Sequence, residues 1–247
     1  MMEDEVSRID ELISRFQNSD GAKLFRRLRV LEQGTKTLKT NHNRLQEAIT
    51  DARSATVESV RRDTDTLNDS MTLRIATEFH NFLWATKAAY ESGETIRTEY
   101  FTDDMRRTYR GRMSLQKGRG ELMKQLRNHT QHTFPLPVKV SSRPSLLESY
   151  RESTDAEVYL RRSDIEEHVD LNRAASEYLE SLDGPFELDN EARRYYQEAA
   201  KANTILVNLY VEEYWEELME RDRIARELKQ LAAEHSSAPQ HSNKNGA

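Results

Sequence analysis

At 247 residues, the chain is long enough for one large domain or two small ones, and for a hydrophobic core. Only 36% of its residues are hydrophobic, 32% are charged and the mean hydropathy is -0.89, which predicts much solvated helix surface. Eight glycines and five prolines are few for a turn-rich β-sandwich, and without cysteine the chain has neither disulfides nor thiolate metal sites.

The net charge is -6, and the sequence contains neither an apolar run of about 18 residues nor a basic segment followed by an apolar one. We therefore expect a soluble, cytoplasmic protein that does not bind membranes.

Residues 1–69 are predicted to form a helical extension. Apolar residues recur every three or four positions in 3–17, and the segment Asn18–Gly21 (NSDG) ends that helix. Further on, residues 37–69 are polar with sparse apolar positions, a pattern typical of an exposed, coiled-coil-like helix. Such an arm would need a partner to be stable, so the N-terminal helices are a candidate protein-binding element.

A long central helix is predicted from Met71, where the apolar stripe becomes wider (MTLRIATEFHNFLWATKAAYE). Asp103 and Asp104 suit the beginning of the next helix, where carboxylates are favourable. A helical pattern then continues until Pro135 and Pro137, which cannot extend it.

The rest of the chain predicts a small β-hairpin insertion within residues 137–162, because short β-branched or alternating runs flank a polar segment. Ser163 and Glu166 match a capping box at the beginning of a helix that extends to about Leu182. A final helix is predicted over residues 192–231, followed by a disordered tail, 232–247. The predicted domain lies at 70–231.

Metal and cofactor motifs are missing from the sequence. Glu78 and His80 are too close for the Glu-x-x-His pattern of carboxylate-bridged helical bundles, and the chain has no phosphate-binding loop and no G-x-S-x-G. We expect neither a metal nor a cofactor.

A basic segment precedes Pro135. Residues 105–132 hold eight Lys and Arg side chains against one carboxylate, a local net charge of +7 in an acidic chain. This asymmetry indicates contact with a polyanion, and Tyr109 would offer a surface on which a base could stack. A solvated helix face balanced by acidic helices explains the same pattern. The predicted nucleic-acid contacts are Arg106, Arg107, Arg110, Arg112, Lys117, Arg119 and Lys124.

The segment ends in RNHTQH, residues 127–132. Residues five apart on a helix lie about 140° apart, so Arg127 and His132 meet only if the helix frays after Gln131 or if two copies meet across a two-fold axis. An imidazole can act as acid or base on a ribose 2′-OH, and a guanidinium can hold the phosphate. The alternative is favourable interaction of cations with a helix C-terminus.

Arg127-Asn128-x-x-x-His132 resembles the R-x(4–6)-H signature of the HEPN superfamily (higher eukaryotes and prokaryotes nucleotide-binding domains), over about residues 71–231. Many members are metal-independent ribonucleases that act as dimers, and others have lost activity and bind partners. The resemblance implies that Arg127 and His132 are catalytic and that Asn128 orients them.

The spacing alone is weakly specific, because Arg74 to His80 and Arg161 or Arg162 to His168 also satisfy it. Asn128, the basic run and the proline-marked helix end distinguish Arg127. His80 and Asn81, in EFHNFL, are predicted to hold the catalytic residues in position through hydrogen bonds. The alternative is that they are buried core residues bonded to the backbone.

These observations predict an all-α protein: a HEPN-like bundle of long antiparallel helices with an N-terminal extension and a hairpin insertion. The predicted function is that of a homodimeric, metal-independent endoribonuclease or RNA-binding protein. The alternative is a catalytically inactive helical module that binds a protein partner.

Overall fold

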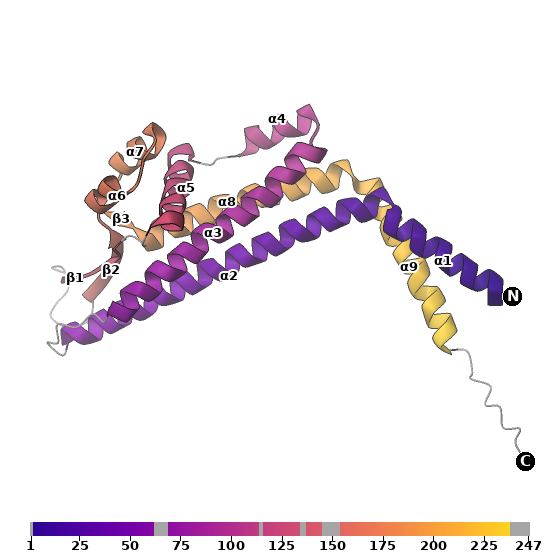
Figure 1. Ribbon diagram of the computed structural model, residues 1–247, viewed down its shortest axis with the longest axis horizontal. Helices are drawn as coiled ribbons and strands as arrows, with labels where there is room; N and C mark the ends of the chain where they lie inside the picture. Colours follow the sequence, from indigo (N-terminus) through magenta and orange to yellow (C-terminus); the bar gives the residue numbers. More distant parts are fainter. Residues whose placement is uncertain (1, 62–68, 114–115, 134–136, 145–153, 238–247) are drawn as a thin grey trace, which may run out of the picture. The chain divides into compact units, whose positions relative to one another are not determined.

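The computed structural model of the protein describes residues 2–61, 69–113, 116–133, 137–144 and 154–237 (Figure 1). Nine helices and three short strands make up these residues, which confirms the predicted all-α class. None of the helices in these ranges is long and apolar enough to cross a membrane. The chain forms two compact units, one of residues 31–206 and one of residues 1–30 with 207–247. The divisions fall at 30/31 and 206/207 rather than at the predicted 69/70.

The smaller unit contains α1 (Met2–Asn18), the beginning of α2 (Asp20–Arg61), the end of α8 (Leu188–Glu213) and α9 (Trp215–Ser237). Its core consists of buried apolar side chains at helical spacing, from α1 and α9: Leu12, Ile224 and Leu231, with Ile9, Phe16 and Leu228 packed against them. Gly21 allows α2 to approach α9 closely, because a Cβ there would collide with the backbone of Glu217.

The C-terminal prediction needs two corrections. The expected single helix over 192–231 is two helices, which separate at Tyr214. The second, α9, continues to Ser237, so residues 232–237 are helical rather than disordered. The remainder of the predicted tail, 238–247, lies outside the described residues.

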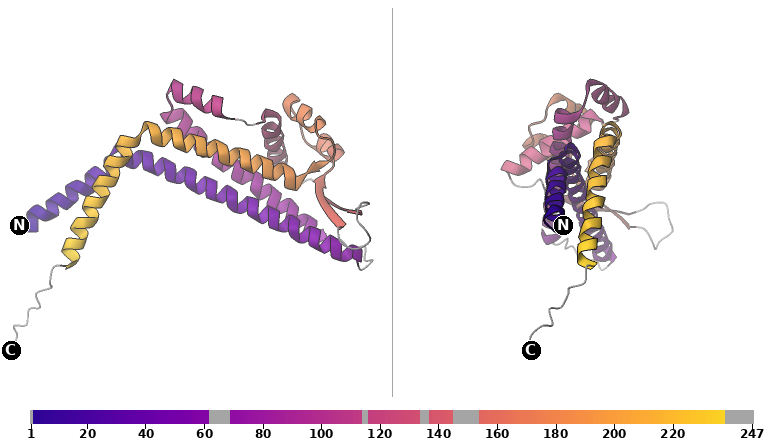
Figure 2. Two further views of the ribbon diagram at one scale, coloured as in Figure 1. Left: turned by 180° about the vertical axis from the view of Figure 1, so that it is seen from behind. Right: turned by 90° about the vertical axis from the view of Figure 1, so that its right-hand side faces the viewer.

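The larger unit is built on α2 from Leu31, α3 (Asp69–Tyr100) and α8, which lie side by side in both views of Figure 2. Apolar residues at three- and four-residue spacing on α2 are fully buried: Leu38, Leu45, Ile49 and Ala52. They pack with Phe82 and Leu83 of α3 and Ala192 of α8 in one core.

The prediction of an exposed arm over residues 37–69 is therefore wrong for the described part of that segment. The sparse apolar residues of α2 are enough to hold it in the bundle because these four are completely buried, and polar residues add further contacts. His42 stacks on Tyr196 of α8 with ring centroids 4.3 Å apart, and Arg53 forms an ion pair with Asp189 at 2.8 Å. The partner that α2 needs is supplied within the same chain.

Two helices cross this bundle after α3: α4 (Asp103–Arg112) and α5 (Lys117–His132). Asp103 and Asp104 occupy the first turn of α4 as predicted, and the Thr102 side chain caps it by accepting from the Met105 backbone N–H. α5 packs on α3 and on α7 (Arg173–Glu180). At Gly118 the approach to α7 is close, because a Cβ there would lie 2.6 Å from Cβ of Tyr178.

The predicted hairpin is present as β1 (Lys139–Pro144) and β2 (Thr154–Leu160), paired antiparallel with Val140 opposite Val158. A third strand that was not predicted, β3 (Phe186–Glu187), pairs with β2 and places Leu160 opposite Phe186. Both of these side chains are buried in the main core, which attaches the small sheet to the bundle.

The single helix predicted over residues 163–182 is wrong. The segment forms α6 (Arg162–His168) and α7, separated by Val169 in an extended conformation and by Asn172, whose side chain caps α7. The capping box is also wrong, because Arg161 is the N-cap of α6 and no side chain bonds to that end. Ser163 lies inside the first turn instead.

Candidate functional site

Arg127 lies in the second half of α5 and is half-buried. Its Nη2 donates a hydrogen bond of 3.0 Å to Oδ1 of Asn128, a neutral partner. Its Nε is buried and has no hydrogen-bond partner. Within the described residues no carboxylate lies within ion-pair distance of this guanidinium, so its positive charge is available to a ligand.

His132 is the last residue of α5, and its side chain lies outside the described part of the protein. The helix does not fray after Gln131: it includes His132, and the Thr133 backbone N–H still bonds to the His129 carbonyl at 3.0 Å. Arg127 and His132 therefore lie on faces about 140° apart within one chain. The fraying that was expected to bring the two residues together within one chain is therefore absent at Gln131.

A cavity of about 480 Å³ lies beside Arg127, within the larger unit. Residues of α3 and α8 line two sides of the cavity. The remaining lining residues lie between Tyr109 and Arg127, on α4, on α5 and on the segment that connects them. Five cationic side chains line it against two carboxylates: Lys87, Arg97, Lys117, Lys124 and Arg127 against Glu91 and Glu121.

Two of these cations are already engaged by the carboxylates in the wall. Lys87 lies 3.6 Å from Glu91, and Lys124 lies 3.6 Å from Glu121. Lys117, at the beginning of α5, has no carboxylate within ion-pair distance in the part of the chain that the structure describes. The end of the cavity formed by α5 is therefore electropositive.

Arg97 occupies the other end of the cavity and was not identified from the sequence. Its guanidinium lies over the rings of Tyr90 and Tyr109, 5.3 and 5.1 Å from their centroids, and it pairs with Glu94. Burial raises the pKa of Tyr109, and its ring also meets the edge of Phe101. Because Tyr109 is buried, it does not offer the stacking surface that was expected. Nothing in the local sequence TIRTEY distinguishes Arg97 from other helix-surface arginines.

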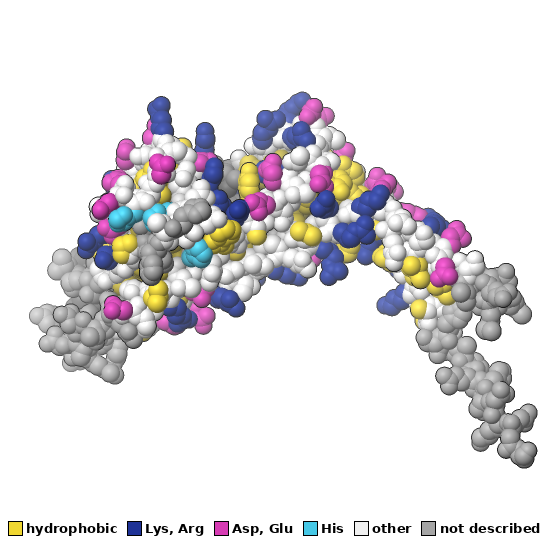
Figure 3. All heavy atoms as spheres, viewed as in Figure 1, with side chains coloured by type: hydrophobic (Ala, Val, Ile, Leu, Met, Phe, Trp, Pro, Cys, Tyr) yellow, Lys and Arg dark blue, Asp and Glu magenta, His cyan; other side chains and the backbone are white. Residues whose placement is uncertain are grey.

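The predicted nucleic-acid contacts divide into an exposed group and one exception. Arg106, Arg107, Arg110, Arg112, Lys117 and Lys124 are exposed, and Figure 3 shows Lys and Arg side chains gathered over α4 with acidic side chains among them. Arg107 pairs with Asp104 at 3.3 Å and Arg106 with Asp103 at 4.0 Å. Arg110 and Arg112 have no ion-pair partner among the described residues.

Arg119 is the exception. It was predicted to contact nucleic acid, but it is buried. Only 5% of the residue is exposed, and its Nε donates to the Tyr178 hydroxyl at 2.9 Å and to Glu191 at 3.0 Å. Its Nη1 pairs with Glu198. Every one of these partners belongs to α7 or α8, so Arg119 joins three helices and is not accessible to RNA.

This buried network shifts the pKa of its members. Burial, followed by the hydrogen bond to Glu191, raises the pKa of the Tyr178 hydroxyl to about 12. Burial also raises the pKa of Glu198, against the opposing effect of Arg119. The network fixes the first half of α5 and so positions Lys124 and Arg127 beside the cavity.

His80 and Asn81 do not line the cavity that contains Arg127. The His80 ring meets the Trp84 ring on the same helix, with centroids 6.2 Å apart, and the Asn81 amide donates to Glu78 at 3.5 Å. The structure thus gives these two residues local contacts on α3, and their predicted supporting role remains a prediction.

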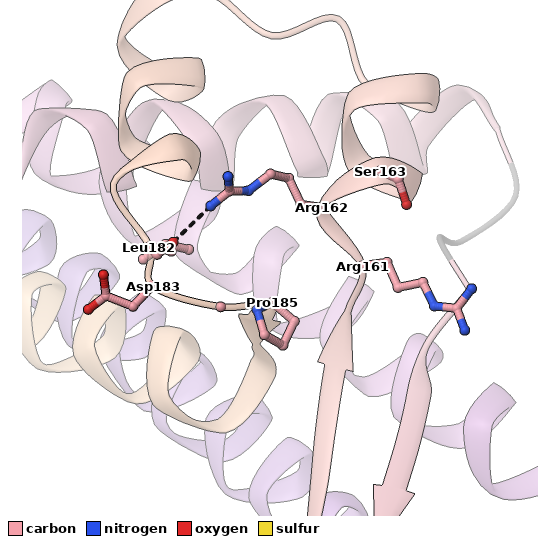
Figure 4. Close-up of a pocket in the computed structure, with 7 residues that line it drawn as sticks. Arg161, Arg162, Ser163, Leu182, Asp183 and Pro185 are labelled. Atoms are coloured by element: carbon pink, nitrogen blue, oxygen red, sulfur yellow. Dashed lines mark hydrogen bonds between the residues drawn. The ribbon is translucent and has the colours of Figure 1, made fainter.

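The competing arginines have structural explanations. Arg74 pairs with Asp51 across α2 and α3 at 2.7 Å. Arg162 donates to the carbonyls of Leu179 and Leu182 at 2.9 and 2.8 Å, at the end of α7. Figure 4 shows its guanidinium directed at Leu182 in an open depression of about 470 Å³, while Arg161 points away. Arg74 is thus paired with a carboxylate, whereas Arg162 is held by backbone carbonyls, which are neutral partners.

No family model, curated protein or solved structure matches the chain. Within the described residues, no group of three or more His, Asp or Glu side chains is arranged to hold a metal ion. The site must therefore be interpreted from its own chemistry.

Proposed function

We propose that the protein is a homodimeric, HEPN-like RNA-binding protein that cleaves RNA without a metal. Support comes chiefly from Arg127, whose guanidinium has a single neutral partner, Asn128, and no carboxylate within ion-pair distance among the described residues. A cation without a carboxylate, among other exposed cations, suits a phosphate, because arginine can hold two phosphate oxygens at once.

RNA would bind along the exposed cations of α4 and α5, through contacts to the phosphate backbone. Arg110, Arg112 and Lys117 carry this proposal best, because they lack ion-pair partners in the described residues. Contacts of this kind are independent of base sequence and weaken as salt concentration rises.

Cleavage would use Arg127 of one protomer and His132 of its partner, because one continuous helix separates the two residues. The imidazole would remove the proton from the 2′-OH, whose oxygen then attacks the neighbouring phosphorus and displaces the 5′-oxygen. The guanidinium would stabilise the negative charge that develops on the phosphoryl oxygens.

RNA binding is tested by fluorescence anisotropy with labelled RNA at several salt concentrations. Reversing Arg110 and Arg112 to glutamate should lower affinity at least tenfold and flatten the salt dependence. The matched control reverses Lys39 and Arg44, exposed cations of α2 in the same unit. Equal losses in the two double variants would contradict the proposed surface.

Cleavage is tested in EDTA with the parent protein and the variants Arg127→Ala and His132→Ala, with Gln131→Ala as the control. Each active-site variant should be inactive alone. Mixing the two and allowing subunits to exchange should restore about a quarter of the parent activity, because half of the dimers are mixed and each has one intact pair. No cleavage by the parent, or equal cleavage by parent and His132→Ala, would contradict the enzymatic proposal.

A second candidate, a non-catalytic module that binds a protein partner, is favoured by an exposed apolar pair on α9. Trp215 is 53% exposed and Met219 37% exposed, and residues four apart share a helix face. Exposed aromatic and methionine side chains are enriched where proteins bind each other. Replacing both by glutamine should abolish such binding and leave RNA binding unchanged.

A further inference from the structure

The cavity beside Arg127 has properties that RNA binding along α4 does not use. Its volume of about 480 Å³ is within the range of small-molecule sites. It is elongated, because its lining follows α3 from Thr86 to Arg97, eleven residues or about 16 Å of helix. α8 follows the same path, since a Cβ on Gly93 would lie 3.3 Å from Leu206.

The walls along α3 and α8 combine polar or charged residues, such as Thr86, Glu91 and Asn203, with small and apolar ones. The small and apolar residues are Ala89, Gly93, Ala199, Ala202 and Leu206. The small side chains on these two helices leave an elongated channel between them. Arg97 lies over the rings of Tyr90 and Tyr109, of which Tyr109 is buried and Tyr90 is 60% exposed.

The electropositive part of the lining is supplied by α5, through Arg127, Lys124 and Lys117. The guanidinium of Arg127 has one hydrogen-bond partner, the neutral Oδ1 of Asn128, and no carboxylate within ion-pair distance among the described residues. Burial raises the pKa of the Tyr195 hydroxyl, and Thr86 and Arg127 oppose this shift, so Tyr195 lies near Arg127 in the lining. An anionic group beside Arg127 would offset its positive charge.

We propose that the cavity binds a small amphipathic anion, a carboxylate with an unbranched hydrocarbon body. The carboxylate would bind Arg127, and the body would extend between α3 and α8 toward Leu206. A straight chain fits a channel lined by alanine and glycine, and a carboxylate matches the planar guanidinium through two parallel hydrogen bonds. The proposal does not depend on RNA binding or cleavage.

Chain length provides the first test. Calorimetric titration of the full-length protein with hexanoate, octanoate and decanoate, each below its aggregation concentration, should give one saturable site. Affinity should rise about fourfold for each added methylene group, as expected when hydrocarbon is buried. Decanol has the same hydrocarbon chain as decanoate but no carboxylate, and it should bind at least tenfold more weakly. No saturable binding, or equal affinity for hexanoate and decanoate, would overturn the proposal.

Matched variants provide the second test. Ala199→Leu should narrow the channel and lower decanoate affinity at least tenfold, whereas Ala200→Leu, on the same helix but outside the lining, should not. Arg127→Gln should lower affinity at least tenfold, and Arg44→Gln, an equal charge change elsewhere, should leave it unchanged. Circular dichroism and thermal unfolding verify that each variant is folded. Equal effects within either pair would overturn the proposal.

The outcomes are separable from those of the proposed function. The double reversal of Arg110 and Arg112 should weaken RNA binding and leave decanoate affinity unchanged, since neither residue lines the cavity. Failure to bind RNA would leave the cavity proposal intact. Failure to bind decanoate would leave the RNA proposal intact.

Discussion

The two halves of α5 use arginine in opposite ways. In the first half, Arg119 is buried and binds two glutamates and a tyrosine of α7 and α8. In the second half, Arg127 is half-buried, binds one neutral amide and keeps an unbonded Nε. Both belong to one basic run in the sequence. The difference teaches that burial and partners, rather than local charge, decide whether a cation holds the fold together or can bind a ligand.

The largest expected effect is the loss of the buried network. Replacing Arg119 by methionine leaves Glu191 and Glu198 buried without their main partner, which should lower the free energy of unfolding by about 3–5 kcal/mol. Adding Glu191→Gln to the same chain should recover part of that loss, because it removes one stranded charge. Urea denaturation followed by circular dichroism measures both.

Arg127→Gln is the matched control in the same helix. It should change the free energy of unfolding by less than about 1 kcal/mol, because the residue is half-exposed and has only a neutral partner. The contrast between the halves of α5 fails if the Arg119 and Arg127 variants lose similar stability.

A smaller effect is expected from the two glycines beside Arg119. In Gly118→Ala the new Cβ would lie 2.6 Å from Cβ of Tyr178 and 2.8 Å from the Ala174 carbonyl. Overpacking of this kind costs about 1–3 kcal/mol. Gly120→Ala meets nothing within 4 Å and should stabilise the helix by up to about 1 kcal/mol. Thermal unfolding should move in opposite directions for the two variants, and a shift in the same direction would contradict the close α5–α7 contact.

The pH dependence of Tyr178 tests the same network more finely. Its hydroxyl ionises near pH 10 when unfolded and at about 12 in the fold, so the folded state binds more protons between these values. This contribution to the free energy of unfolding, about 3 kcal/mol, is therefore complete below pH 10 and is lost as the pH rises toward 12. Tyr178→Phe should be less stable than the parent at pH 7, and this deficit should shrink from pH 10 to 12. A deficit that stays constant would show that the hydroxyl has an ordinary pKa.

Several features of the fold were predictable because they depend on local chemistry. The central helix predicted from Met71, the helix start at Asp103, the break near Ser19 and the hairpin after residue 137 follow from apolar spacing, carboxylates at helix ends and prolines. Two predictions failed where long-range packing decides. The sparse apolar positions of α2 looked like an exposed arm, yet Leu38, Leu45, Ile49 and Ala52 are buried in one core with residues of α3 and α8. The Ser163 capping pattern was present, but the helix begins one residue earlier and ends at His168.

The candidate site was only partly visible in the sequence. Arg127 and Asn128 were chosen by motif, and their hydrogen bond is one that local geometry allows between neighbours on a helix. Arg97, Lys87 and Tyr195 were missed, because they come from two other helices and carry no motif. Arg119 looked equivalent to its neighbours, since a linear sequence does not reveal that glutamates 72 and 79 positions away lie beside it.

The sequence by itself determined the helical class, the concentration of positive charge before Pro135 and the identity of Arg127 as a residue with unusual neighbours. These properties depend on residue spacing and composition over short stretches of the sequence, so they do not require knowledge of how distant segments pack. Only the tertiary structure decided which cations are buried, that α5 continues through His132, and that a channel lies between α3 and α8. Those properties depend on distances between residues far apart in the chain, and packing of whole helices sets them.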